Sequence, residues 1–198
     1  MRLADAIKTA VMTPDRIHVS SAKGLRFKKH IIVSGLTDEL LALGYQDDGP
    51  HVIEGMPQFH LRLFYHPDVK AYAMVIATDA DGAWVDLHCK YAQGQRYHSY
   101  TATNTTSPRV GVLDKPPGVV SKKRPGVSVA TLHKGFLKDR PKGRLSPVAA
   151  GGCARALEES HAHEMDWRNG RAVQRQRRSP RLQHCHAESL GRKIHSRN

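Results

Sequence analysis

Four strand-like segments follow one another in the middle of the chain with only a few residues between them: residues 58–65, 70–78, 83–90 and 95–102. The breaks carry turn-forming sequences, such as His66-Pro67-Asp68 and Asp79-Ala80-Asp81-Gly82. Connections this short cannot contain a crossover helix, so neighbouring segments are expected to pair as an antiparallel meander.

Within the segments, apolar and polar residues alternate, and this alternation predicts which side chains share a face of the sheet. The apolar positions are Phe59, Leu61, Leu63 and Tyr65 in the first segment, and Ala83, Val85, Leu87 and Cys89 in the third. The polar positions between them would form one solvated face that carries His60, Arg62, Asp86 and His88. The second segment is apolar on both faces, which is typical of a central strand.

Those four polar residues are the most site-like group for an enzyme, because Arg62 and Asp86 could flank a ligand lying over the central strand. Antiparallel sheets often leave one face in water, so we favour a solvated face with scattered charges. A concave pocket around Asp86 and His88 would support an enzyme, and a flat sheet would exclude one.

Three stretches carry helix signals. A short amphipathic helix is predicted from a cap at Thr37 to Gly44, and a second from a cap at Ser128 to about Asp139. A third is expected within residues 147–169, with an onset delayed by a pair of glycines.

The expected fold class is therefore α+β, with an antiparallel four-stranded meander packed against about three helices and a disordered basic C-terminal tail. A single domain would cover residues 31–170, after an N-terminal extension over residues 1–30 whose order the sequence does not decide. Residues 171–198 are rich in Arg, Gln, Ser and His. They hold too few large apolar residues to offset the entropy cost of ordering, which predicts the tail.

Positive charge is concentrated in two places. The chain has a formal net charge of +13, yet residues 1–114 carry 12 basic and 12 acidic side chains. The excess lies in residues 115–144 and 168–198, each with 9 basic residues and 1 acidic residue. Such clusters attract phosphate or acidic protein surfaces. Nonspecific nucleic-acid contact is therefore one prediction, through Lys122, Lys123, Arg124, Lys134 and Lys138.

Cofactor and metal motifs are weak. The sequence has no phosphate-binding loop and no dinucleotide fingerprint, and we expect no cofactor. His161 and His163 would point apart on a helix, while the tail sequence His184-Cys185-His186 lacks two further ligands, so no metal site is predicted. Three cysteines without close spacing and no long apolar run suggest a soluble cytoplasmic protein with no membrane partner.

Several short sequences together resemble a family of uncharacterised bacterial proteins. They are the strand Trp84-Val85-Asp86-Leu87, the helix end Phe136-Leu137-Lys138-Asp139-Arg140-Pro141 and the late helix Met165-Asp166-Trp167-Arg168-Asn169. The resemblance covers roughly residues 36–170 and implies the fold outline but no activity. Beyond it, the sequence departs from the family pattern, which suggests either a divergent tail or a shifted reading frame.

Two functions of different classes remain open. The first, which we prefer, is a noncatalytic binding or interaction module, with or without nucleic-acid contact. The second is a small enzyme that uses the polar face of the sheet. Partner, ligand and oligomeric state are not indicated by the sequence.

Overall fold

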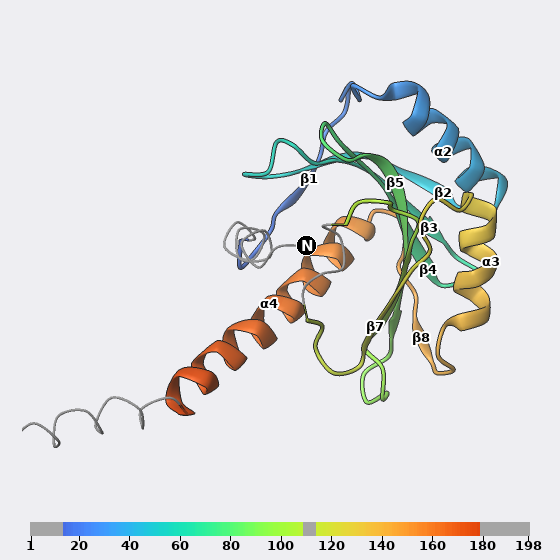
Figure 1. Ribbon diagram of the computed structural model, residues 1–198. Coiled ribbons are helices and arrows are strands. Elements are labelled where there is room, and N and C mark those ends of the chain that lie inside the picture. The colour runs from blue at the N-terminus through green and yellow to red at the C-terminus, as the bar shows by residue number, and fades with distance from the viewer. Residues whose placement is uncertain (1–13, 109–113, 179–198) are drawn as a thin grey trace, which may run out of the picture.

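The computed structural model describes residues 14–108 and 114–178, and for residues 171–178 it describes the backbone only. The helices are α2 (His30–Ala42), α3 (Val129–Asp139) and α4 (Cys153–Arg178). The strands are β1 (Val19–Ser21), β2 (Gln46–Ile53), β3 (His60–His66), β4 (Ala71–Thr78), β5 (Gly82–Tyr91), β6 (Ser99–Thr103), β7 (Val119–Lys123) and β8 (Leu145–Ser146). The fold class is α+β, as expected (Figure 1).

The strands form one sheet in the order β1-β2-β3-β4-β5-β6-β7, and β8 pairs with the end of β5. The meander β3-β4-β5-β6 is antiparallel, as predicted, and the β6–β7 pair is parallel. The expectation of four strands was wrong, because β2 and β7 have poor strand signals. The sequence of β2 contains Asp47, Asp48, Gly49 and Pro50, and a register shift between Asp47 and Gly49 accommodates them.

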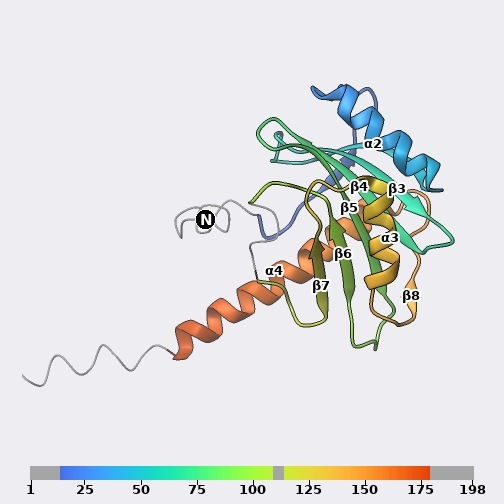
Figure 2. The same cartoon turned by 45° about the vertical axis from the view of Figure 1, so that its right-hand side comes forward.

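Helices cover both faces of the sheet. One hydrophobic cluster joins Val33 and Leu40 of α2 and Leu132 and Phe136 of α3 to the sheet. A second joins Cys153 and Ala156 of α4 to the opposite face. Figures 1 and 2 show α2 and α3 on one side and α4 crossing the other. The prediction of one solvated face was therefore wrong, since each face has its own core.

The central position of β4 is confirmed. All eight of its residues are buried, and it lies between β3 and β5 in the middle of the sheet. A strand that contributes to two cores must be apolar on both faces, which is the pattern that residues 71–78 show.

The helix boundaries partly agree with the sequence signals. Ser128 caps α3, since its side chain accepts a hydrogen bond from the Thr131 amide. The prediction of a cap at Thr37 was wrong: α2 already begins at His30, and the buried Thr37 hydroxyl donates to the Val33 carbonyl. The signal at Thr37 misleads because a Thr hydroxyl can also bond back within a helix.

Helix α4 starts at Cys153, after the glycine pair, as expected. Asp48 on β2 accepts hydrogen bonds from the amides of Gly151 and Cys153, at 2.8 and 3.4 Å. The helix continues to Arg178, so residues 171–178 are helical and not part of a disordered tail. The rest of that prediction, with the sequence His184-Cys185-His186, lies outside the described residues. Within the described part, no helix is long and apolar enough to cross a bilayer.

Candidate functional site

A cavity of about 590 Å³ lies between α4 and the β5–β7 end of the sheet. Its floor is formed by side chains that share one face of three strands. They are Asp86 and His88 of β5, Ser99, Thr101 and Thr103 of β6, and Ser121 of β7. Its roof is formed by one face of α4, with Leu157, Ser160, His161 and Glu164, and by Lys115 from the segment before β7.

Strand register places the floor residues side by side. Asp86 is opposite Thr103 and His88 is opposite Thr101, while Thr101 is next to Ser121 across the parallel pair. Since alternate residues of a strand point to the same face, all five side chains face α4. The short side chains of Thr101, Thr103 and Ser121 leave space under the helix. Helix α4 packs tightly near its N-terminus, where Cys153 and Ala156 are buried.

Asp86 is a buried acid with an unused oxygen. Only 9% of the residue is exposed. Burial raises the pKa of its carboxyl group to about 6, although hydrogen bonding by Thr103, the Lys115 charge and hydrogen bonding by Trp84 each lower it. Among the described residues, no group hydrogen-bonds to Asp86 Oδ1. An ionisable group that is buried and under-satisfied in a cavity is a typical feature of functional sites.

His88 is fixed in orientation by two neighbours. Its ring stacks on Tyr72 at 4.9 Å between centroids, and its Nδ1 lies 3.0 Å from Thr101 Oγ1. Burial, assisted by the Lys115 charge, lowers the pKa of the imidazole to about 3, so the ring is neutral at physiological pH. Within the described part of the chain, its Nε2 is buried and makes no hydrogen bond.

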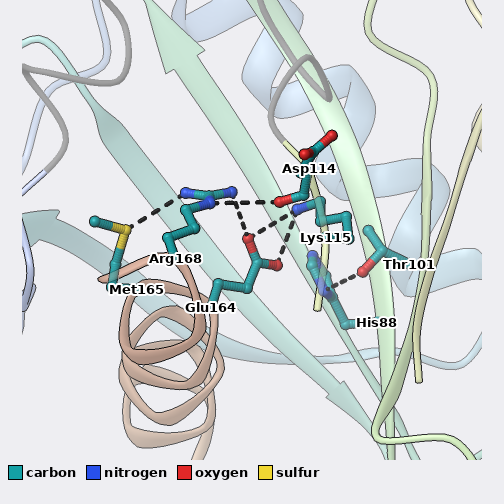
Figure 3. Close-up of polar contacts among 7 residues, drawn as sticks. All are labelled: His88, Thr101, Asp114, Lys115, Glu164, Met165 and Arg168. Atoms are coloured by element: carbon teal, nitrogen blue, oxygen red, sulfur yellow. Dashed lines mark hydrogen bonds and ion pairs between the residues drawn. The ribbon is translucent and has the colours of Figure 1, made fainter. Parts of the chain in front are cut away.

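An ion cluster closes the roof above His88 (Figure 3). Lys115 Nζ donates to both carboxylate oxygens of Glu164, at 2.9 and 3.0 Å. Arg168, one helical turn further along α4, donates to the same carboxylate at 3.1 Å and to the Asp114 carbonyl at 3.4 Å. Glu164 therefore fixes the lysine over the cavity, where its charge acts on both Asp86 and His88.

The structure separates the four polar residues that the sequence placed together. Leu61 is opposite Ile76 and Met74 is opposite Asp86, so the face of Asp86 and His88 is that of the apolar β3 residues. Arg62 is opposite Val75 and points to the other face.

On that other face, Arg62 forms an ion pair with Asp47 at 2.6 Å, and the His60 ring contacts Phe27 edge-on. The prediction of one polar face carrying His60, Arg62, Asp86 and His88 was therefore wrong. Both faces of the sheet are covered by a core, and the polar residues of β3 lie on the opposite face from those of β5. Asp86 and His88 line the cavity beneath α4, whereas Arg62 lines a separate cavity of about 520 Å³ beside α2.

Other residues of the cavity were not found from sequence. Lys115 and Glu164 are far apart along the chain, and only the fold brings them together. Leu157, Ser160, His161 and Glu164 have the spacing of one helix face, which was the available signal. No group of three or more His, Cys, Asp or Glu side chains in the described ranges is arranged to hold a metal ion.

Four of the five predicted nucleic-acid residues lie outside the cavity, on the sheet edge and on α3, and Lys123 is the exception. Lys122 and Arg124 both form ion pairs with Asp139 of α3, the former at 3.2 Å. Lys123 donates to the Ser107 carbonyl and lines the cavity. Lys134 and Lys138 are exposed on α3. Nucleic-acid contact stays a prediction, and Asp139 reduces the charge that this surface offers.

Comparisons with protein-family models, curated proteins and solved structures return no match. The resemblance to a bacterial family therefore also stays a prediction, and the cavity itself must supply the argument for function.

Proposed function

We propose that this chain is a binding module for a small, neutral, polyhydroxylated molecule, which it takes up in the cavity between α4 and strands β5–β7. The observation that carries the proposal is the lining of a cavity of about 590 Å³, in which five hydroxyl side chains lie beside Asp86 and His88. A concave site with a few convergent polar groups is the usual form of a small-molecule binding site.

The balance of charge favours a neutral ligand. The cavity is lined by two acidic side chains, Asp86 and Glu164, and by two lysines, Lys115 and Lys123. Lys115 is already paired with Glu164. An anionic ligand would have to compete with Glu164 for this lysine, and a cationic ligand would compete with the lysine for Glu164.

The lining favours a ligand with many hydroxyl groups. Ser99, Thr101, Thr103, Ser121 and Ser160 each supply a hydroxyl group that can both donate and accept a hydrogen bond. Leu157 and Val119 add apolar surface for the carbon skeleton. A sugar or polyol has this combination of hydroxyl edges and C–H faces.

The proposal is tested by titrating the protein with ribitol, glucose and dihydroxyacetone while recording amide NMR spectra. Saturable shifts are expected at Asp86, Thr101 and Thr103, with weaker responses to citrate and spermidine. Asp86→Asn should weaken binding by about tenfold, because a charge-assisted hydrogen bond is lost.

Asp47→Asn provides the matched control, since Asp47 is paired with Arg62 on the opposite face and does not line the cavity. It should bind as the unmodified chain does. If none of the three neutral compounds gives saturable shifts at the cavity, or if citrate binds most tightly, the proposal is wrong.

A further inference from the structure

We propose that the outer end of α2 docks on an anionic membrane surface, where Ile31 and Ile32 enter the headgroup region and basic side chains lie against the lipid phosphates. Residues 23–32 form this surface, which we call the α2 tip. The inference is independent of the proposed function, because α2 and α4 pack on opposite faces of the sheet. The expectation of no membrane partner rested on the lack of a long apolar run, which contact at a membrane surface does not require.

Two large apolar side chains of the α2 tip are exposed to solvent. Ile31 is 76% exposed and Ile32 is 50% exposed, and both lie in the first turn of α2. They are the two most exposed large hydrophobic side chains in the described part of the chain. Figures 1 and 2 show the start of α2 at the upper edge of the molecule. Scattered exposed side chains are normal, whereas an adjacent pair on a protruding element favours an interaction surface.

The α2 tip also carries positive charge that the fold does not neutralise. Residues 1–114 are balanced as a whole, yet residues 22–37 contain four Lys and Arg side chains and no Asp or Glu. Lys28 forms an ion pair with Asp79 at 2.6 Å, and Lys29 donates to the Asp79 carbonyl at 3.5 Å. Lys23 and Arg26 are exposed and form no ion pair within the described residues. Two unpaired cations near two exposed isoleucines suit a partner that is both anionic and apolar.

The start of α2 adds to this positive potential. No side chain caps the helix, and its first turn contains no acidic residue. The amides at the start of a helix carry partial positive charge and attract phosphate groups. This feature would not indicate a site alone, but at the α2 tip it acts together with Arg26 and the exposed isoleucines.

The open cavity beside α2 has a lining that suits a lipid headgroup and the start of its acyl chain. Its volume is about 520 Å³, and Leu25, Phe27 and Val33 supply apolar walls. Arg26 belongs to the same lining, so a phosphate at this arginine would have apolar surface next to it. Arg62 also lines the cavity, but its charge is already paired within the fold. No acidic side chain is among the described residues of the lining.

The exposed isoleucines favour a membrane over two other anionic partners. A nucleic acid would use the basic side chains, but contact with its phosphates gives no role to Ile31 and Ile32. A stable protein interface takes about 20–30 residues from each partner, which is more than the α2 tip provides. A lipid surface requires no matching shape, so a short segment that combines apolar and basic side chains is sufficient.

Flotation of the full chain with lipid vesicles tests the proposal. The protein should bind phosphatidylglycerol vesicles at low salt, bind phosphatidylcholine vesicles weakly, and lose most of its binding at high salt. The double variant Ile31→Ser, Ile32→Ser keeps the charge and should lower the partition coefficient at least about tenfold. Arg26→Gln should lower it about fivefold, because one cation at an anionic surface contributes about that factor.

Leu41→Ser is the matched control, since Leu41 is an exposed side chain of the same helix outside the α2 tip. It should bind as the unmodified chain does. All the substituted side chains are exposed, so the variants should fold, which thermal unfolding checks.

The isoleucine variant distinguishes docking from simple attraction of charge. A chain of net charge +13 is attracted to any anionic surface, so binding that survives in the double variant overturns the proposal. Absence of binding to phosphatidylglycerol vesicles at low salt also overturns it. An equal loss of binding to a random DNA duplex in the double variant would assign the α2 tip to nucleic acid instead. None of these outcomes affects the proposal for the cavity under α4.

Discussion

Asp86→Asn is expected to stabilise the folded protein at pH 7. Burial shifts the pKa of the Asp86 carboxyl from 3.8 to about 6, and each unit corresponds to about 1.4 kcal/mol, so ionised Asp86 costs about 3 kcal/mol. An asparagine in the same place carries no charge, but its unpartnered amide costs about 1 kcal/mol. The expected net gain in the free energy of unfolding is therefore about 2 kcal/mol.

The pH dependence of this gain follows from the direction of the shift. A carboxyl whose pKa is raised in the folded state favours the fold when protonated, so its contribution is present below about pH 3.8 and is lost as pH rises through about 6. The advantage of Asp86→Asn should therefore be full at pH 7 and disappear near pH 3.5.

His88 opposes Asp86 in the same pH window. The pKa of His88 is lowered from 6.5 to about 3. Its contribution to folding stability is therefore fully present above pH 6.5 and is lost as pH falls through about 3. In the unmodified chain, the changes of folding stability with pH that come from Asp86 and from His88 partly cancel between pH 4 and 6. In Asp86→Asn nothing opposes the loss of stability caused by protonation of His88, so the free energy of unfolding should fall more steeply on acidification.

Urea unfolding at several pH values measures both effects, and Asp47→Asn is the control of opposite sign. Burial raises the pKa of Asp47, but hydrogen bonds from Arg62 and the Gly49 amide hold it below its ordinary value. That carboxylate stabilises the fold, so its replacement should destabilise the protein at pH 7. A loss of stability in Asp86→Asn at pH 7 would show that the carboxylate is satisfied in the fold, which contradicts the reasoning for the cavity.

A buried carboxylate that lowers folding stability, such as Asp86, is evidence for a functional site. Proteins keep strained or under-satisfied groups where a ligand or a reaction uses them. Of the residues that the sequence marked as site candidates, Asp86, His88 and Arg124 each have a buried side-chain atom without a partner among the described residues, whereas Arg62 is paired with Asp47.

The sequence predicted the meander well because its evidence is local. Turn chemistry and short connections specify antiparallel neighbours for β3 to β6, and the apolar pattern of β4 specifies its central position. The edges were missed for the opposite reason. Strand β2 forms despite Gly49 and Pro50, and β7 forms from Val119-Val120-Ser121-Lys122-Lys123, since tertiary pairing overrides weak intrinsic preference.

The assignment of residues to faces of the sheet failed because alternation shows only which residues of one strand share a face. It does not show which of those faces lies on the same side of the sheet as a given face of the next strand. Leu61 and Val85 are both core residues, yet they lie on opposite faces of the sheet. The β4 pattern, apolar on both faces, was already evidence for two cores. With two cores, a polar residue such as Asp86 is a buried exception, and that is why it indicates a site.

Phe136→Ala is expected to have the largest destabilising effect that we predict. Phe136 of α3 is fully buried and stacks on Tyr100 of β6 at 5.3 Å between ring centroids. Truncation of a buried phenylalanine costs about 3–5 kcal/mol through lost burial and the cavity that remains. Because Tyr100 lies between Ser99 and Thr101, a loosened β6 should also disturb the floor of the ligand cavity.

The neighbouring Leu137 supplies the control. It lies on the same helix but is 39% exposed, so Leu137→Ala should cost roughly 1 kcal/mol or less. Urea unfolding measures the difference, and amide NMR of Thr101 and Thr103 reports whether the floor has moved. Equal losses from the two variants would mean that α3 does not anchor β6. The floor of the cavity would then not depend on α3, which packs against the opposite face of the sheet.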